Sequence, residues 1–214
     1  MLYKMKNLGC DDKILLSLYF SLFQSHLSYG LVAWGSSVYS KNLFLIQKRA
    51  IRAISGLGFS DSTTDSFKKL KILTLEKLYH SKLASLMWDF DHAGLPNHLR
   101  TLFKYSSEVH SYTTRSSFNA NLAQNIGFKT KVGSLMLSCT GPKVLNALKT
   151  LSFYNDSYTK HSFLAKYKII CLICLVNSHF HNFIHVVLVS HSITILSFIR
   201  ILYHQSIIIS FSSA

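Results

Sequence analysis

Acidic side chains are scarce in this chain. Its 214 residues include 9 Asp and Glu against 23 Lys and Arg, a formal net charge of +14. All the acidic residues lie at or before Asp156, and after Lys168 only Arg200 is charged at neutral pH. A charge this one-sided favours a polyanionic partner, either a nucleic acid or an acidic membrane.

Cysteine is scarce too, and the N-terminus lacks the pattern of a secretory signal. Four cysteines make no disulfide framework in a chain of this size. The first residues carry Lys4, Lys6, Lys13 and the pair Asp11-Asp12, with no clean apolar core before a small-residue cleavage site. We therefore expect a reduced protein inside the cell.

Catalytic motifs are missing as well. Polymerase chemistry needs two Mg²⁺ ions held by carboxylates, some of them in a Tyr/Phe-x-Asp-Asp hairpin. Asp11-Asp12 is the only acidic pair, Gly9 stands where the aromatic residue should be, and we expect the pair to cap a helix. No Gly-x-Ser-x-Gly elbow and no phosphate-cradling glycine loop occurs. We predict no catalytic residue and no cofactor in this chain.

A metal site is not predicted either. Cys171-x-x-Cys174 has metal-like spacing, and three histidines follow it: His179, His181 and His185. The stretch is apolar and lacks the turn residues of a zinc knuckle.

Helical periodicity dominates the first half of the chain. Apolar residues recur at three- and four-residue steps in three stretches, 13–29, 40–55 and 75–90. Gly30 and Gly35 mark the end of the first and Gly56 the end of the second, and Thr74 is the expected N-cap of the third. The apolar face expected for the second helix consists of Leu43, Ile46, Gln47, Ala50 and Ile54. Three amphipathic helices with short connections predict a small bundle.

The pattern changes after residue 104. Alternation of apolar residues and lysines over 128–132 predicts a half-exposed strand. Gly141-Pro142 predicts a short helix over 143–148 with proline at its first position. A last helical stretch, 157–172, has an expected apolar face of Phe163, Tyr167 and Ile170.

The tail beyond residue 172 has no acid, glycine or proline. Its segment 183–202 is long enough to span a bilayer, but His185, Ser190, His191 and Thr194 interrupt it. The tail is either a membrane segment or unselected translation beyond an ancestral stop, and we favour the second.

Two sets of residues are candidate binding or structural sites. Cations crowd one side of the second helix and the segment before the third: Lys48, Arg49, Arg52, Lys68, Lys69 and Lys71. They can neutralise successive phosphates in sequence-independent binding, or simply form a solvated face. The turn residues Tyr29, Gly30, Trp34 and Gly35 are expected to serve close backbone packing instead.

These residues carry a family resemblance. His26-Leu27-Ser28-Tyr29-Gly30 with Trp34-Gly35, and then Ile46-Gln47-Lys48-Arg49-Ala50-Ile51-Arg52, resemble the region after the palm in reverse transcriptases of non-LTR retrotransposons, closest to the jockey-like and related LINE elements. Further similar blocks come next in the family's order: 67–73, 75–79, 95–96, 110–115, 141–148 and 163–172. Leu145 departs from the family's usual tryptophan, and the fingers, palm and endonuclease are absent.

The resemblance implies a fragment of an RNA-directed DNA polymerase. In the family, Mg²⁺ serves the palm, and the thumb lies along the template–primer duplex. The implied partners are an RNA–DNA or DNA duplex, with element RNA for the intact parent, and the implied place is the nucleus or cytoplasm. We expect no activity from this chain alone. The alternatives are a small protein anchored in a membrane through 183–202, or a non-functional retroelement remnant.

The predicted fold is mainly α. We expect an N-terminal remnant (1–12), a three-helix thumb-like bundle (13–104), a small mixed α+β C-terminal region (105–172) and an apolar, His- and Ser-rich tail (173–214), either disordered or membrane-prone.

Overall fold

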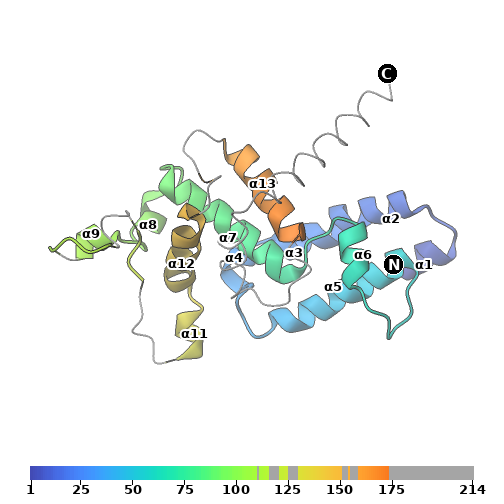
Figure 1. The fold of residues 1–214 in the computed structure, drawn as a ribbon. Helices are drawn as coiled ribbons and strands as arrows, with labels where there is room; N and C mark the ends of the chain where they lie inside the picture. The colour runs from blue at the N-terminus through green and yellow to red at the C-terminus, as the bar shows by residue number, and fades with distance from the viewer. Residues whose placement is uncertain (110, 116–120, 125–129, 151–153, 155–158, 174–214) are drawn as a thin grey trace, which may run out of the picture. The chain divides into compact units, whose positions relative to one another are not determined.

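A computed structural model describes residues 1–109, 111–115, 121–124, 130–150, 154 and 159–173 (Figure 1). The chain divides into two compact units, Met1–Leu175 and Val176–Ala214. The second unit lies wholly outside the described residues, and with it the candidate span 183–202. Every described helix belongs to the first unit.

The described residues are mainly α-helical, as predicted. The N-terminal helices are α1 (Leu2–Asn7), α2 (Asp12–Leu18), the π-helix η1 (Tyr19–Gln24), α3 (Ser25–Ser28), α4 (Leu31–Trp34), α5 (Ser40–Ser55) and α6 (Thr64–Lys69). After them come α7 (Leu75–Asp91), α8 (Asn97–Arg100), α9 (Ser106–Val109), α11 (Lys131–Ser134), α12 (Leu137–Lys149) and α13 (Lys160–Ile173).

Two hydrophobic clusters hold these helices together. The first joins α5 to α2, η1 and α6 through Leu15, Tyr19, Ala50, Ile51, Ile54, Phe67 and Ile72. The second is built on α7, against which α3, α4, α12 and α13 pack. In this cluster the Trp88 indole stacks on Phe163, 4.5 Å away by ring centroids, and it also stacks on the exposed His92, 4.0 Å away. Helices on both sides of the expected boundary at 104/105 therefore share one core.

Helices α5 and α7 match the second and third predicted helices. Gly56 ends α5 in the left-handed region, with φ 65°, and Thr74 occupies the N-cap position of α7. One residue of the predicted apolar face is wrong, because Ile46 is 46% exposed whereas Ile51 is fully buried.

The first predicted helix differs in its middle. α2, η1 and α3 follow one another without a break over 12–28, but η1 is π-helical. A π-helical stretch has more residues per turn, so it rotates the faces beyond it. Leu15, Tyr19 and Leu27 are buried on one side, whereas Leu22, which the α-helical period places with them, is 48% exposed.

The strand predicted over 128–132 is wrong in its described part. Residues 131–134 form α11. The N–H of Gly133 donates to the Thr130 hydroxyl at 3.2 Å, and the N–H of Ser134 donates to the Thr130 carbonyl, also at 3.2 Å. Such local bonds from a threonine start a helical turn and compete with strand pairing. Residues 128 and 129 lie outside the described ones.

No strand occurs in the described part of the expected α+β region, where the one β feature is an isolated antiparallel bridge between Tyr105 and Leu122.

Helix α12 begins earlier than predicted, so Pro142 lies inside it and not at its first position. The extra first turn buries Cys139 and brings Gly141 close to α7 and Phe103. The free energy gained by burying these residues offsets the loss of the one backbone hydrogen bond that proline removes. In α13, Phe163 and Tyr167 are buried as predicted. The third buried residue is Cys171, whereas the predicted Ile170 is only partly buried.

Gln47 links three segments of the first unit. Its side chain is fully buried, and its Nε2 donates to the Tyr19 hydroxyl at 3.0 Å and to the Leu73 carbonyl at 2.9 Å. Its Oε1 accepts from the Leu75 N–H at 2.9 Å. This amide therefore caps the start of α7, a role that the Thr74 side chain does not take.

Helix α7 ends in a turn that suits glycine but carries alanine. Ala93 has φ 58°, and the Gly94 N–H reaches back to the Asp89 carbonyl at 2.7 Å, as in a Schellman motif. Because a Cβ is disfavoured there, Ala93→Gly should raise the free energy of unfolding by about 0.5–1 kcal/mol in urea titrations. The exposed Ala33, inside α4, is the control: Ala33→Gly should lower stability instead, and a gain at both sites would contradict this account.

His80 makes stability depend on pH. Burial lowers the pKa of its imidazole from 6.5 to about 4. Between these values the unfolded chain binds the extra proton and the folded chain does not, so stability is full above pH 6.5 and is lost as pH falls toward 4. We expect a loss of about 2 kcal/mol between neutral pH and about pH 5, measured by urea midpoints. His80→Leu should remove most of that difference; an unchanged pH profile would assign it to other groups.

Candidate nucleic-acid interface

Helix α5 positions two of the predicted cations together. Lys48 and Arg52 are one helical turn apart and line the same cleft beside the loop that leads to α6. The Lys48 Nζ lies 4.6 Å from the centroid of the Phe44 ring. The Arg52 Nε and Nη2 both donate to the Asp61 carbonyl, at 3.2 and 3.1 Å. A main-chain bond of this kind fixes the guanidinium without neutralising it.

The cleft has a volume of about 260 Å³ and a lining that is about half polar and half apolar. Its remaining lining comes mostly from hydroxyl-bearing residues, namely Ser60, Ser62, Thr63, Thr64 and Thr74. Asp61 also lines it, and its carboxylate accepts a hydrogen bond from the Gly58 N–H at 2.8 Å. Cationic and hydroxyl donors therefore outnumber the single acidic side chain.

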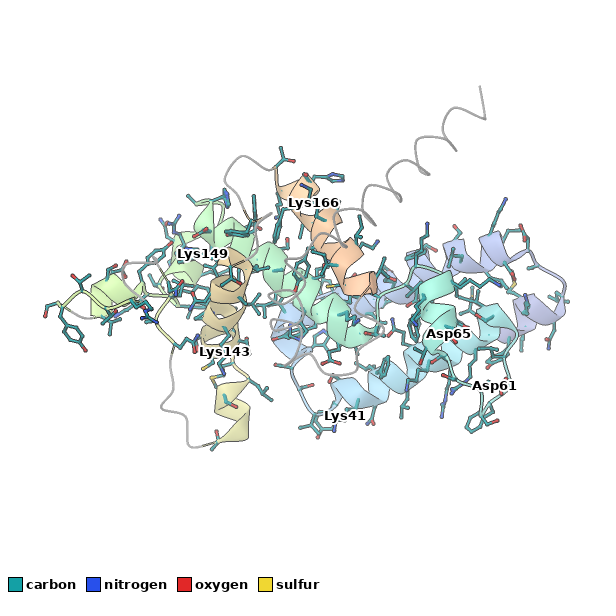
Figure 2. The ribbon with its side chains drawn as sticks, viewed as in Figure 1. Lys41, Asp61, Asp65, Lys143, Lys149 and Lys166 are labelled. Carbon is teal, nitrogen blue, oxygen red and sulfur yellow. The ribbon has the colours of Figure 1, made fainter. Side chains whose placement is uncertain are left out.

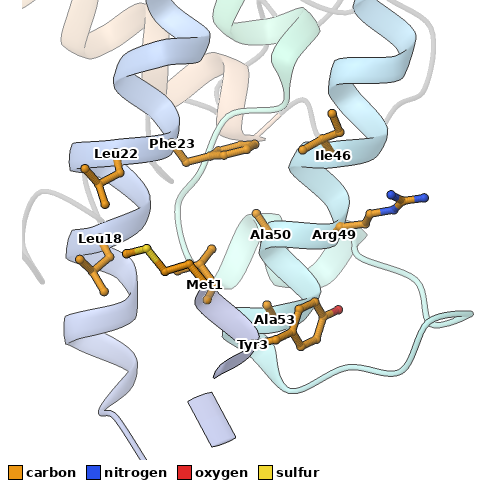
Figure 3. A pocket seen from close by; sticks show the side chains of 10 residues that line it. Met1, Tyr3, Leu18, Leu22, Phe23, Ile46, Arg49, Ala50 and Ala53 are labelled. Atoms are coloured by element: carbon orange, nitrogen blue, oxygen red, sulfur yellow. The ribbon is translucent and has the colours of Figure 1, made fainter. Parts of the chain in front are cut away.

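Arg49 is not part of this cleft. Its side chain borders an apolar groove that α5 forms with α1, α2 and η1. Figure 3 shows its guanidinium directed away from Met1 and Leu18 on the other side of that groove. The predicted triad thus separates into a pair, Lys48 and Arg52, and a third cation on a neighbouring face.

The next lysines along the chain lie at the end of α6. Lys68 forms an exposed ion pair with Asp65 at 3.5 Å, whereas Lys69 and Lys71 are exposed and form no ion pair with the described residues. Lys71 has φ 54°, and the Ile72 N–H donates to the Phe67 carbonyl at 3.0 Å across it. Lys71 is therefore the left-handed residue of a second Schellman turn, where glycine is usual.

Several acidic residues are already paired with lysines elsewhere. Ion pairs join Asp12 to Lys6, Asp89 to Lys160 and Asp91 to Lys149, and Figure 2 labels Lys149 on α12. In contrast, Lys48, Arg49 and Arg52 form no ion pair with a carboxylate of the described residues. The positive charge of α5 is therefore open to an external anion.

The turns at Gly30 and Gly35 allow α4 to pack closely against α7. Gly30 has φ 58°, and the Trp34 indole N–H donates to the Tyr29 carbonyl at 2.9 Å. A Cβ on Gly35 would lie 2.5 Å from the Tyr79 ring, so α4 can approach α7 this closely only at a glycine. Tyr29 is 85% exposed and takes part in the turn through its backbone, whose N–H donates to the Ser25 and His26 carbonyls and whose carbonyl accepts from Trp34.

No group of three metal-ligating side chains occurs among the described residues. Cys171 is buried, and the other residues of the metal-like motif lie outside the described ranges. Within the described ranges, no helix is both long enough and apolar enough to cross a bilayer.

The hydroxyl-bearing residues that line the cleft, here called the hydroxyl wall, were not predicted from the sequence: Ser60, Ser62, Thr63, Thr64 and Thr74. The segment 60–66 is rich in Ser, Thr and Asp, but no role was predicted for it from the sequence, and α6 was not predicted. The available signal was the Ser62-Thr63-Thr64 run, which the chain folds back against the basic side of α5.

Searches of protein-family models, curated proteins and solved structures found no match to this chain.

Proposed function

We propose that this chain corresponds to the thumb and post-thumb part of a non-LTR retrotransposon reverse transcriptase and contacts the sugar–phosphate backbone of an RNA–DNA or DNA duplex. It contributes binding without chemistry, because it carries none of the palm carboxylates. In the intact parent family the palm, with its Mg²⁺, supplies polymerisation.

The observation that carries the proposal is the unpaired cationic side of α5. Lys48 and Arg52 are held in place by contacts with an aromatic ring and a main-chain carbonyl, so their charges are not cancelled. Lys69, the last residue of α6, and Lys71 just after it are further exposed cations. Phosphate contacts of this type are insensitive to base sequence and weaken steeply with salt.

The test is binding of the full chain to a fluorescent RNA–DNA hybrid over a range of salt concentrations. A Lys48→Ala, Arg49→Ala, Arg52→Ala triple variant should bind more weakly, with a slope of log K against log salt that is shallower by about 1 to 2, the number of phosphate contacts removed.

A matched variant removes equal charge elsewhere. Lys82, Lys143 and Lys168 are exposed on α7, α12 and α13, and a triple alanine variant at these sites should keep most of the wild-type slope. Equal losses in the two triple variants would mean that net charge alone drives binding and would contradict a role for α5.

A further inference from the structure

We infer that the cleft between α5 and the loop 60–64 is a specific seat for one phosphate group, formed by Lys48, Arg52 and the Thr63 hydroxyl. The inference rests on the proposed function for the source of the phosphate, a phosphodiester of the duplex backbone. It goes further because it assigns the binding of one phosphate to these three residues and not to the other exposed cations.

The two cations are preorganised. Arg52 donates through Nε and Nη2 to one carbonyl, that of Asp61, which fixes the guanidinium plane and leaves Nη1 without a described hydrogen bond. Lys48 has no ion pair or hydrogen bond among the described residues, and its ammonium is kept over the Phe44 ring. Two like charges fixed at one cleft repel each other, and an anion between them relieves that repulsion.

The hydroxyl wall adds a neutral donor. Thr63 is only 5% exposed, yet its hydroxyl has no hydrogen-bond partner among the described residues. Thr63 lines the cleft beside the two cations. The Thr63 hydroxyl keeps some contact with solvent and can donate to a phosphate oxygen that enters the cleft.

The cleft is large enough for this ligand. Its volume of about 260 Å³ corresponds to roughly eight water molecules, enough for a tetrahedral phosphate that keeps part of its hydration. Arg49 and the lysines of α6 do not line it, so the seat requires only two of the six predicted cations.

A variant of Asp61 is expected to change phosphate affinity in the opposite direction. Asp61 lines the cleft and its negative charge opposes anion binding there, while its carboxylate accepts from the Gly58 N–H. Asp61→Asn keeps an oxygen acceptor for that bond and removes only the charge. It should therefore bind phosphate more tightly, in contrast to every cation-removing variant.

Three single variants and two probes test the seat on the full chain. Lys48→Met keeps the aliphatic stem over Phe44 and should weaken hybrid binding about tenfold, whereas Asp61→Asn should strengthen it several-fold. Lys41→Met removes an exposed charge at the other end of α5, away from the Asp61 loop in Figure 2, and should change affinity by less than about twofold. Circular dichroism of each variant checks that the helices are retained.

The second probe is inorganic phosphate, monitored through the amide chemical shifts of residues 60–64. Shifts that saturate in the wild type and disappear in Lys48→Met support the seat. If the hybrid does not bind but these shifts occur, the proposed function fails and the seat stands as a site for free phosphate. If the hybrid binds with equal losses in Lys48→Met and Lys41→Met, the seat is refuted and the proposed function stands. The seat is likewise refuted if neither probe responds.

Discussion

Replacing Gly35 by alanine is expected to lower the free energy of unfolding by about 3 kcal/mol. The added Cβ would lie 2.5 Å from Cδ2 of Tyr79 and 2.6 Å from the Leu31 carbonyl oxygen. Tyr79 is only 6% exposed, and that carbonyl already accepts the Gly35 N–H at 2.7 Å. Since neither neighbour can move freely, α4 must shift away from α7. Urea unfolding followed by circular dichroism measures the loss.

Gly94 provides the matched control. It has no positive φ, and a Cβ there would approach no atom closer than 3.5 Å, which is ordinary van der Waals contact. Gly94→Ala should therefore change stability by less than about 1 kcal/mol. If the two alanine variants were equally stable, the close approach of α4 to α7 would be disproved.

Gln47→Leu is expected to cost about 3–5 kcal/mol, the largest single effect that we predict. Leucine fills a similar volume but leaves the Leu75 N–H, the Leu73 carbonyl and the Tyr19 hydroxyl without the partner that Gln47 provides. Groups buried without hydrogen bonds are penalised far more than a satisfied hydrogen bond is rewarded.

A double-mutant cycle separates this cause from a simple packing defect. Tyr19→Phe alone removes the hydroxyl that accepts from Gln47 Nε2, at a cost of about 1 kcal/mol. In the Gln47→Leu background the same change removes a buried hydroxyl that has lost this partner, so it should cost nothing or increase stability. Strictly additive losses would show that the two side chains do not interact.

The sequence predicts those parts of the fold whose signals are local. Helix α5 has a regular apolar period and a glycine in the left-handed region just after it, so its bounds could be read directly. The π-helical stretch of η1 could not, because no local residue marks it and its Tyr19 is held by contacts with α5, which is distant in the sequence. The Thr130 turn was missed because alternating residues suggested a strand while the deciding bond was a single hydroxyl cap.

The site was predicted only in part, for the same reason. Charge and spacing identify Lys48, Arg49 and Arg52 as neighbours on one helix, but they do not show what faces each of them. The structure directs Lys48 and Arg52 to a hydroxyl-lined cleft and Arg49 to the border of an apolar groove. That division depends on where the 60–64 loop and α1 fold, which a single helix pattern does not contain. Gln47 was likewise assigned to the apolar face, without its capping role.

The central claim is that this chain binds a nucleic-acid backbone through unpaired cations. The most direct measurement is the affinity of the wild-type chain for two RNA–DNA hybrids of unrelated sequence, titrated with potassium chloride. We predict the same affinity for both and a linear fall of log K against log salt with a slope of about −3. No binding at low salt, or affinity that is independent of salt, would contradict it.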